Sequence, residues 1–302
     1  MAGFRKLVVT IVLLGGFGGL GAYAALPYVW SPNGTRDFNQ TQGDVKRGEY
    51  VARLAGCVAC HTDTKRGGAY LAGGRDFKTP YGIFRAPNIT PDKANGIGDW
   101  SLTQFSDALT KGLSPTGEHY YPAFPYTSYA KMTTQDINDL WAYIKTVEPQ
   151  RQENADHDLA FPFNQRRGLG IWKALYFDDS PYQPNPNQSD DWNRGAYIVN
   201  GPGHCVECHT PRSFLGGLDY TKNLMGTSKG PEGEMVPGIT RDSKNGIGEW
   251  TDMDLTFLLQ LGLTPNGDAV GGAMGEVVQD STAHYSQEDI AAVSNYLIGT
   301  KR

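Results

Sequence analysis

Two stretches of the chain place apolar residues at the spacing of an amphipathic helix. These apolar positions are 137, 140, 141 and 144 in the first stretch, and 290, 293, 297 and 298 in the second. Spacings of three and four residues bring side chains onto one face, so each stretch predicts a helix with one buried stripe. Thr133 or Thr134 can cap the first helix. Ser286 can cap the second, where Glu288 and Asp289 suit the positively polarised first turn.

The order of elements occurs twice along the chain, which indicates an internal repeat. Arg-Gly-x-Tyr at 47–50 returns at 194–197, and Gly-Ile-Gly-acid-Trp at 96–100 returns at 246–250. We therefore expect each half to run from a first helix through a long loop to a second helix, and then through another loop to the terminal helix.

One glycine in the first helix of each half, Gly48 and Gly195, stands where a bulky side chain would keep another helix away. Their matched placement argues against ordinary helix breakers. We expect the first helix to cross the terminal helix at these glycines, near Tyr143 in the first half and near Tyr296 in the second.

Composition between the halves changes to a stretch rich in Pro, Asn, Asp and Gln, which reads as an extended connector with one short helix at 166–176. The predicted division of the chain is a membrane anchor or signal segment at 1–30, a first domain at 40–150, a connector at 151–188 and a second domain at 189–302.

Each half contains the sequence Cys-x-x-Cys-His, at 57–61 and at 205–209, and these motifs use all four cysteines of the chain. This spacing is the attachment site of a c-type haem: each thiol adds across a haem vinyl group, and the histidine is placed to ligate the iron. A thioredoxin-like redox pair or half a zinc site would leave both histidines unexplained. We predict two covalently attached haems c. The residues that bind them are Cys57, Cys60 and His61 in the first half, and Cys205, Cys208 and His209 in the second.

The overall composition agrees with a cofactor-binding protein. The 302 residues include 38 Gly and 18 Pro, which suit a loop-rich fold around a cofactor. The formal net charge of −5 excludes the basic footprint of a nucleic-acid-binding protein. Because no acid–base constellation is visible, we predict no catalytic residues.

The N-terminal region predicts export. Arg5 and Lys6 precede a stretch without charges at 7–30, longer than the roughly 20 residues that a membrane-spanning helix needs. The alternative is a cleaved signal peptide, with Ala-Tyr-Ala at 22–24 as its cleavage site. We favour the anchor because the apolar run continues past that site to Trp30. Under both readings Arg5 and Lys6 stay in the cytoplasm and the body is exported.

The segments that flank the haem motifs are also informative. They include Asn-Ile-Thr-Pro-Asp at 88–92, Tyr-Pro-Ala-Phe-Pro-Tyr at 121–126, Gly-Pro-Gly-His at 201–204 and Thr-Pro-Arg at 210–212. Together with the haem motifs, they resemble the class I cytochrome c domains of bacterial multi-haem cytochromes. Such cytochromes are electron-accepting subunits of periplasmic membrane-bound dehydrogenases for alcohols, gluconate and related sugars. The resemblance implies an all-α fold of two tandem class I cytochrome c domains with an N-terminal transmembrane helix.

The resemblance also implies a methionine as the sixth iron ligand, from the loop before each terminal helix. In the second half this is Met274, in a Gly-rich loop. In the first half the matching residue is Phe124, which cannot ligate iron. Met132 is then the first choice, His119 is the competing ligand, and an open iron is the third option. The predicted iron ligands are His61 and Met132, and His209 and Met274.

Five further side chains are candidates for the haem propionates. They are Trp100, Trp250, Arg75, Arg85 and Arg212. The alternative for the tryptophans is a place in the core, and the alternative for the arginines is a solvated surface.

These features predict a periplasmic, membrane-associated di-haem protein that carries electrons between a dehydrogenase and the respiratory chain. Its expected location is the periplasmic face of the bacterial inner membrane. Its expected partners are redox proteins, namely a dehydrogenase subunit, an oxidase or a quinol-linked complex. The alternative is a di-haem redox enzyme, of the peroxidase or thiosulfate-oxidising type, which uses an open first haem.

Overall fold

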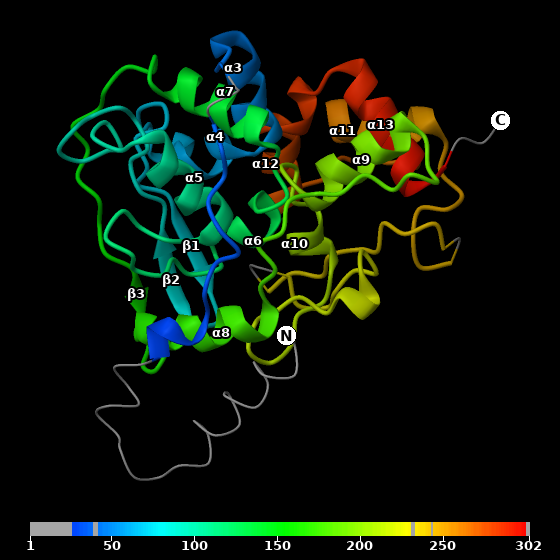
Figure 1. Ribbon diagram of the computed structural model, residues 1–302. Coiled ribbons are helices and arrows are strands. Elements are labelled where there is room, and N and C mark those ends of the chain that lie inside the picture. Colours follow the sequence, from blue (N-terminus) through cyan, green and yellow to red (C-terminus); the bar gives the residue numbers. More distant parts are fainter. Residues whose placement is uncertain (1–25, 39–41, 231–232, 243, 300–302) are drawn as a thin grey trace.

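The computed structural model describes residues 26–299 apart from 39–41, 231–232 and 243. Two mostly helical halves lie side by side, joined by a connector (Figure 1). The first half contains η1 (Leu26–Val29), α3 (Val45–Leu54), α4 (Cys57–His61), η2 (Thr64–Arg66), β1 (Asp76–Thr79), β2 (Gly82–Arg85), α5 (Leu102–Lys111), α6 (Tyr126–Tyr129) and α7 (Thr134–Ile144). The connector contains β3 (Asp158–Leu159), η3 (Arg166–Gly168) and α8 (Leu169–Tyr176). The second half contains α9 (Asp190–Asn200), α10 (Val206–His209), η4 (Tyr220–Lys222), α11 (Asp252–Leu261), α12 (Gly272–Asp280), η5 (Thr282–His284) and α13 (Gln287–Leu297).

The first and terminal helices of each half cross at a glycine. A Cβ atom built on Gly48 would lie 1.9 Å from a backbone carbonyl oxygen of α7, and one built on Gly195 would lie 1.9 Å from a carbonyl oxygen of α13. Such a Cβ would also approach the Cβ of Tyr143 to 2.7 Å in the first half, and that of Tyr296 to 2.8 Å in the second. Both predicted crossings are therefore confirmed.

The terminal helices begin where the sequence places their caps. The Thr133 hydroxyl accepts a hydrogen bond from the Asp136 backbone N–H (3.1 Å), and the Ser286 hydroxyl accepts one from the Asp289 N–H (3.2 Å). Each bond satisfies one of the donors that a helix start leaves free. The helix predicted at 166–176 is also confirmed, as η3 followed by α8.

The expectation of an all-α fold is wrong, because the first half contains a small sheet. Strands β1 and β2 form an antiparallel hairpin in which Phe77 pairs with Phe84. Strand β3 of the connector adds antiparallel to β2, so the order is β1-β2-β3. Gly82 permits this pairing, since a Cβ there would lie 2.2 Å from the Asp158 carbonyl oxygen. Strands of two to four residues are too short for a periodic pattern to identify them, and the pairing of β3 with β2 is long-range.

The transmembrane helix of that expectation is also not found. Among the described residues, none of the helices has the length and apolar character needed to cross a membrane. Most of the predicted span, 1–25, lies outside the described residues. Its end belongs to the folded body: Trp30 is 6% exposed, its ring lies 5.4 Å from that of Phe177, and Lys173 Nζ lies 4.9 Å from its centre. Packing on α8 therefore explains the apolar character of Trp30, which had lengthened the predicted span.

Each half has its own buried core. In the first half Val51 and Ile137 represent the helix faces that meet at the crossing of α3 and α7, and in the second half Ile198 and Ile290 do the same for α9 and α13. Leu54 of α3 packs into the core of the second half, so the two halves share an apolar contact. The predicted domain boundaries stay a prediction.

Two matching polar contacts join the halves. Tyr50 of α3 donates a hydrogen bond to Asp289 Oδ2 at the start of α13 (2.6 Å), and Tyr197 of α9 donates one to Asp136 Oδ2 at the start of α7. Each phenol oxygen also accepts the backbone N–H of the opposite helix cap, at 3.1 Å in both cases. The repeat matches the two tyrosines and the two aspartates, so these contacts relate the halves by an approximate twofold.

Candidate haem sites

The first haem motif forms the short helix α4, with Cys57 buried at its start. His61 Nδ1 lies 2.7 Å from the carbonyl oxygen of Pro87. A carbonyl can only accept, so Nδ1 carries the proton and Nε2 keeps the lone pair that ligates a metal. Burial lowers the pKa of His61, against the opposing effect of the Pro87 hydrogen bond, and so favours the neutral ring.

The second motif repeats this geometry. His209 Nδ1 lies 2.8 Å from the carbonyl oxygen of Pro237, and burial again lowers the pKa of the ring. The sequence analysis missed these two prolines. The signal was present as Pro-x-Ile-Thr at 87–90 and at 237–240, one copy in each half.

The loop after each motif is also built twice. Thr62 Oγ1 accepts the backbone N–H of Leu71 at 3.1 Å, and Thr210 Oγ1 accepts that of Leu224 at 3.0 Å. Both leucines have positive φ angles, 56° and 60°. For a branched side chain this conformation persists only where the surroundings impose it, so the two loops are held in the same strained turn.

The Gly-Ile-Gly motif follows from close backbone packing. A Cβ on Gly96 would lie 2.1 Å from the Thr90 carbonyl oxygen, and one on Gly246 would lie 2.3 Å from that of Thr240. The residue between the glycines, Ile97 in the first half, donates its N–H to the same carbonyl at 2.9 Å. The motif therefore fixes the chain beneath the segment that holds the proximal histidine.

The four thiols suit covalent attachment of haem. All four cysteines are free, and burial raises the pKa of Cys57 and of Cys205 to about 12, so both thiols are neutral. Each thiol pair lies one turn of chain from a histidine with an available Nε2, beside a buried apolar cluster. The residues present fit a covalent haem c in both halves.

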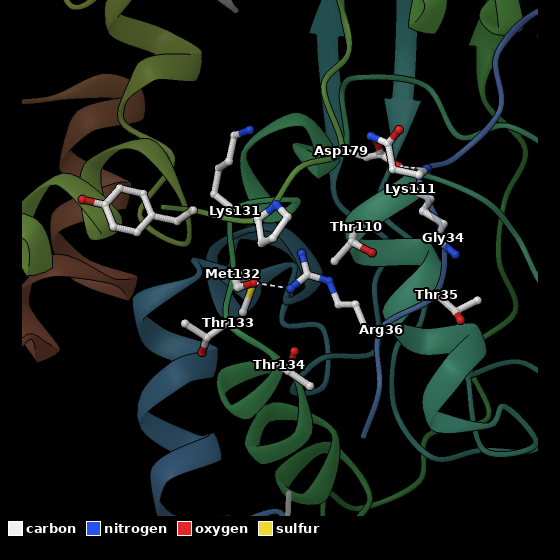
Figure 2. A pocket seen from close by; sticks show the side chains of 13 residues that line it. Gly34, Thr35, Arg36, Thr110, Lys111, Lys131, Met132, Thr133, Thr134 and Asp179 are labelled. Atoms are coloured by element: carbon white, nitrogen blue, oxygen red, sulfur yellow. Dashed lines mark hydrogen bonds between the residues drawn. The ribbon is translucent and has the colours of Figure 1, made fainter. Parts of the chain in front are cut away.

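Met132 is completely buried and belongs to the same apolar cluster as Cys57 and Leu71. Its carbonyl oxygen accepts a hydrogen bond from Arg36 Nη1 at 2.5 Å (Figure 2). Arg36 also lines the cavity drawn in Figure 2, of about 400 Å³, whose walls include no residue of either haem motif. Membership of the Cys57 cluster agrees with the ligand role of Met132, which stays a prediction.

Met274 lies on a helix, so the Gly-rich loop expected around it is wrong. It is partly buried within α12, which packs against α11 and against α4 of the first half. Glu276, two residues further along the chain, forms an ion pair with Lys65 Nζ at 2.7 Å and another with Arg75. These long-range contacts support a short helix despite its glycines. The ligand role of Met274 stays a prediction.

Of the two competing positions in the first half, Phe124 contacts the same cluster and His119 lies apart from it. Phe124 packs on the first core, with its ring 5.7 Å from that of Tyr129. The His119 ring lies 6.3 Å from that of Trp30, on the side of the connector, and Arg166 donates to the His119 carbonyl oxygen. The structure thus places Met132, and not His119, in the cluster that contains Cys57.

The three arginine candidates for propionates have protein partners in the structure. Arg75 forms an ion pair with Glu276, Arg85 forms one with Asp76, and Arg212 forms one with Glu207. Trp100 and Trp250 both pack partly buried against the core of their half. A contact of these five side chains with propionates stays a prediction.

Comparison with known proteins agrees with this geometry. A family model described as cytochrome c matches residues 45–148, which contain the first motif. The chain is 39% identical over 297 residues to a di-haem cytochrome c-type protein of Cereibacter sphaeroides, and the match covers 97% of both chains.

Dehydrogenase subunits are also similar. Identity is 42% over 255 residues to the fructose dehydrogenase cytochrome subunit of Gluconobacter japonicus, and 40% over 264 residues to the gluconate 2-dehydrogenase cytochrome c subunit of Pantoea cypripedii. These matches cover 84% of this chain but only 52% and 58% of those relatives, so the chain spans about half their length. The chain therefore belongs to the c-type cytochromes, with relatives among the cytochrome c subunits of bacterial alcohol, gluconate and fructose dehydrogenases, and is an electron-transfer component rather than an enzyme.

Proposed function

We propose that this cytochrome holds two covalent haems, one in each half, and carries electrons from a dehydrogenase subunit to the respiratory chain at the periplasmic face of the inner membrane. The observation that carries the proposal is the duplicated histidine–proline contact, at 2.7 Å in one half and 2.8 Å in the other. The proposal also includes a dehydrogenase as the redox partner and a location on the exported side of the membrane.

The residues of the chain have simple roles in this function. His61 and His209 present Nε2 to an iron, while Pro87 and Pro237 fix the plane and tautomer of each ring. The bound haem supplies one-electron chemistry. The protein contributes ligands, an apolar shell that limits access of water, and a fixed arrangement of the two sites.

Two lines of argument support the partner and the location. Several relatives are named as cytochrome subunits of dehydrogenases, which supports a dehydrogenase as the electron donor. Haem is attached to Cys-x-x-Cys-His motifs of bacterial cytochromes on the exported side of the membrane, and Arg5 and Lys6 ahead of an uncharged stretch suit export.

The number of haems tests the central claim. We expect two haems per chain in a pyridine haemochrome assay of the full-length protein. The paired variants Cys57→Ala/Cys60→Ala and Cys205→Ala/Cys208→Ala should each retain one. Both haems should be low-spin and undergo reversible one-electron reduction. A high-spin iron that binds cyanide readily in the wild-type protein would contradict the carrier function.

The sixth ligands are tested by removing each methionine. Met274→Ala should remove one of two sets of shifted methionine methyl signals in the reduced protein, lower the potential of one haem and open its iron to small ligands. Met132→Ala should do the same to the other haem. If His119→Ala, rather than Met132→Ala, makes the first haem high-spin, that haem has bis-histidine ligation.

A further inference from the structure

We infer that Glu207, inside the second haem motif, is a positioning residue for the methionine ligand of the first haem. Glu207 lies beside Cys208 on α10, whereas Met132 follows α6 in the other half. The inference rests on the proposed function, since it takes Met132 as an iron ligand. It makes the ligand set of one haem dependent on the attachment site of the other.

The contact is direct and buried. Glu207 is 7% exposed, and its Oε1 accepts hydrogen bonds from Thr127 Oγ1 at 2.5 Å and from Ser128 Oγ at 2.7 Å. Arg212 Nη2 donates to the other carboxylate oxygen at 2.5 Å and to the Glu207 carbonyl oxygen at 2.9 Å. All the partners of the carboxylate are therefore polar and close, which is the condition under which a buried charge is tolerated.

Helix α6 depends on contacts of this kind. It is only four residues long and has no side-chain cap, so it cannot hold its position by its own hydrogen bonds. Glu207 binds two of its four residues, and the Tyr129 hydroxyl donates to the Ala55 carbonyl oxygen at 2.5 Å. Figure 1 shows α6 lying between the two halves, next to α10.

Contacts with the second half flank Met132 on both sides along the chain. On its N-terminal side the Met132 N–H bonds the Tyr129 carbonyl oxygen at 2.9 Å, directly after the segment that Glu207 binds. On its C-terminal side the Thr133 N–H donates to the Tyr197 hydroxyl at 3.1 Å. Two side chains of the other half, Glu207 and Tyr197, thus help to position the backbone that carries the methionine, together with Arg36 of the first half, which binds the Met132 carbonyl oxygen.

A related contact runs in the opposite direction. Glu276, on the helix that carries Met274, forms ion pairs with Lys65 and with Arg75 of the first half. Arg75 also donates to the carbonyl oxygen of Ala59, the residue that matches Glu207 in the first motif. In the first contact the carboxylate is Glu207, which belongs to a haem motif. In the second contact it is Glu276, which belongs to the helix that carries Met274. Each methionine segment is therefore fastened to the haem motif region of the other half.

Two substitutions at Glu207 separate its hydrogen bonds from its charge. Glu207→Ala installs the residue found at position 59 and removes both. Glu207→Gln removes the charge but keeps an oxygen that accepts from Thr127 and Ser128. The full-length holoprotein is compared by methionine methyl signals in the reduced state, by imidazole binding to each ferric iron and by the potential of each haem. The variants Met132→Ala and Met274→Ala assign the signals to the two haems.

We expect Glu207→Ala to weaken the first-haem methionine signals and to make the first iron bind imidazole several-fold more tightly. The second-haem methionine signals should remain. Glu207→Gln should keep both sets of signals while raising the potential of the second haem, whose attachment motif contains the lost charge. The variant Thr127→Val/Ser128→Ala, on α6, should reproduce the first-haem effect with the glutamate intact, and it provides the test if Glu207→Ala does not fold.

The inference is overturned if Glu207→Ala and Thr127→Val/Ser128→Ala both leave the first-haem signals and imidazole affinity at wild-type values while Met132→Ala abolishes those signals. An unchanged first-haem spectrum in Met132→Ala would instead overturn the proposed ligand, and with it this inference. The two failures are therefore distinguishable.

Discussion

The second helix of each half differs between the halves more than the haem motifs do. In α5 Asp107 and Lys111 form an ion pair of 2.7 Å, and Lys173 of the connector donates to the carbonyl oxygens of Lys111 and Gly112 at 2.6 and 2.8 Å. In α11 the positions matching the ion pair hold Phe257 and Leu261, which are 45% and 61% exposed. The connector thus covers the end of α5 and leaves the equivalent end of α11 open.

The comparison teaches which parts of the duplicated unit are constrained. Residues that hold the proximal histidine, such as Pro87 and Pro237, keep both identity and geometry in the two halves. Residues at the crossing of the halves, such as Tyr50 and Tyr197, are kept for contacts with the opposite half. The second helices lie outside these two zones, and there the ion pair of α5 has no counterpart in α11.

The largest loss of stability should come from substituting the glycines at which the first and terminal helices of each half cross. Gly48→Ala and Gly195→Ala each insert a Cβ 1.9 Å from a backbone carbonyl oxygen, so two helices must separate. We expect a loss of about 3 kcal/mol or more in the free energy of unfolding, or failure to mature, from either variant. Denaturant unfolding followed by circular dichroism measures this. The control is Gly168→Ala, because Gly168 has open space around it and an ordinary φ of −65°. A mild effect of Gly195→Ala alone would show that the two crossings are not equivalent.

The success of the sequence analysis at these glycines, and its failure elsewhere, have one physical cause. Helix faces and caps depend on local spacing, so the crossing at Gly48 and the cap at Ser286 were predictable. Strand β3 lies within the connector and pairs with β2 far earlier in the sequence, and strands this short carry no periodic pattern. The place of Trp30 was misjudged for the same reason, since its burial depends on α8.

The candidate sites show the same division. The Cys-x-x-Cys-His spacing identifies attachment and proximal residues on its own. Pro87 and Pro237 act through backbone carbonyls, so their side chains give no chemical signal, although their repetition does. Glu207 occupies a variable position of the motif. Its role depends on Thr127, which lies eighty residues away in the sequence and belongs to the other half.

A smaller effect is expected from removing the Asp289 carboxylate, which joins the two halves at the start of α13. Burial by itself would raise the pKa of Asp289, but hydrogen bonds from Arg194 and Tyr50 outweigh it and hold the pKa below its usual range. The stabilisation is therefore present above the unfolded pKa of about 3.9 and is lost as the pH falls through the folded value. We expect Asp289→Asn to lose about 2 kcal/mol of unfolding free energy at neutral pH.

The pH profile provides the check on Asp289. Unfolding free energies measured from pH 7 down to the acid transition should fall less steeply below about pH 4 in Asp289→Asn than in the wild-type protein. Asp99→Asn is the control, because the Asp99 side chain is 67% exposed. Parallel wild-type and Asp289→Asn curves would show that the ion pair does not contribute to the acid sensitivity.

The matched tyrosines Tyr50 and Tyr197 should give a smaller loss of stability, and they compare the two sides of the interface directly. Tyr50→Phe and Tyr197→Phe each remove one hydroxyl that bonds a carboxylate and a helix cap of the other half. We expect each to cost about 1 kcal/mol of unfolding free energy. The larger loss should come from Tyr197→Phe, since Tyr197 is 4% exposed and Tyr50 is only partly buried. Denaturant titrations of both variants and of the double variant measure the order. Equal losses would mean that burial does not distinguish the two sides of the interface.

The smallest effect is expected where the halves differ most. Phe257→Asp/Leu261→Lys transplants the ion pair of α5 onto the open face of α11, with the acid N-terminal to the base at the favourable spacing of four residues. Both side chains are substantially exposed, so little apolar contact is lost. The new ion pair stabilises the helix by a few tenths of a kcal/mol. We expect the unfolding free energy to change by less than about 0.5 kcal/mol, with unaltered haem spectra.

The reverse change, Asp107→Phe/Lys111→Leu, is the matched control and should cost more, because Lys111 is 5% exposed and lies beneath the connector. A large loss from the α11 variant would show that this face is covered in the working protein, and sedimentation at increasing concentration would then distinguish a second copy of the chain from a different partner.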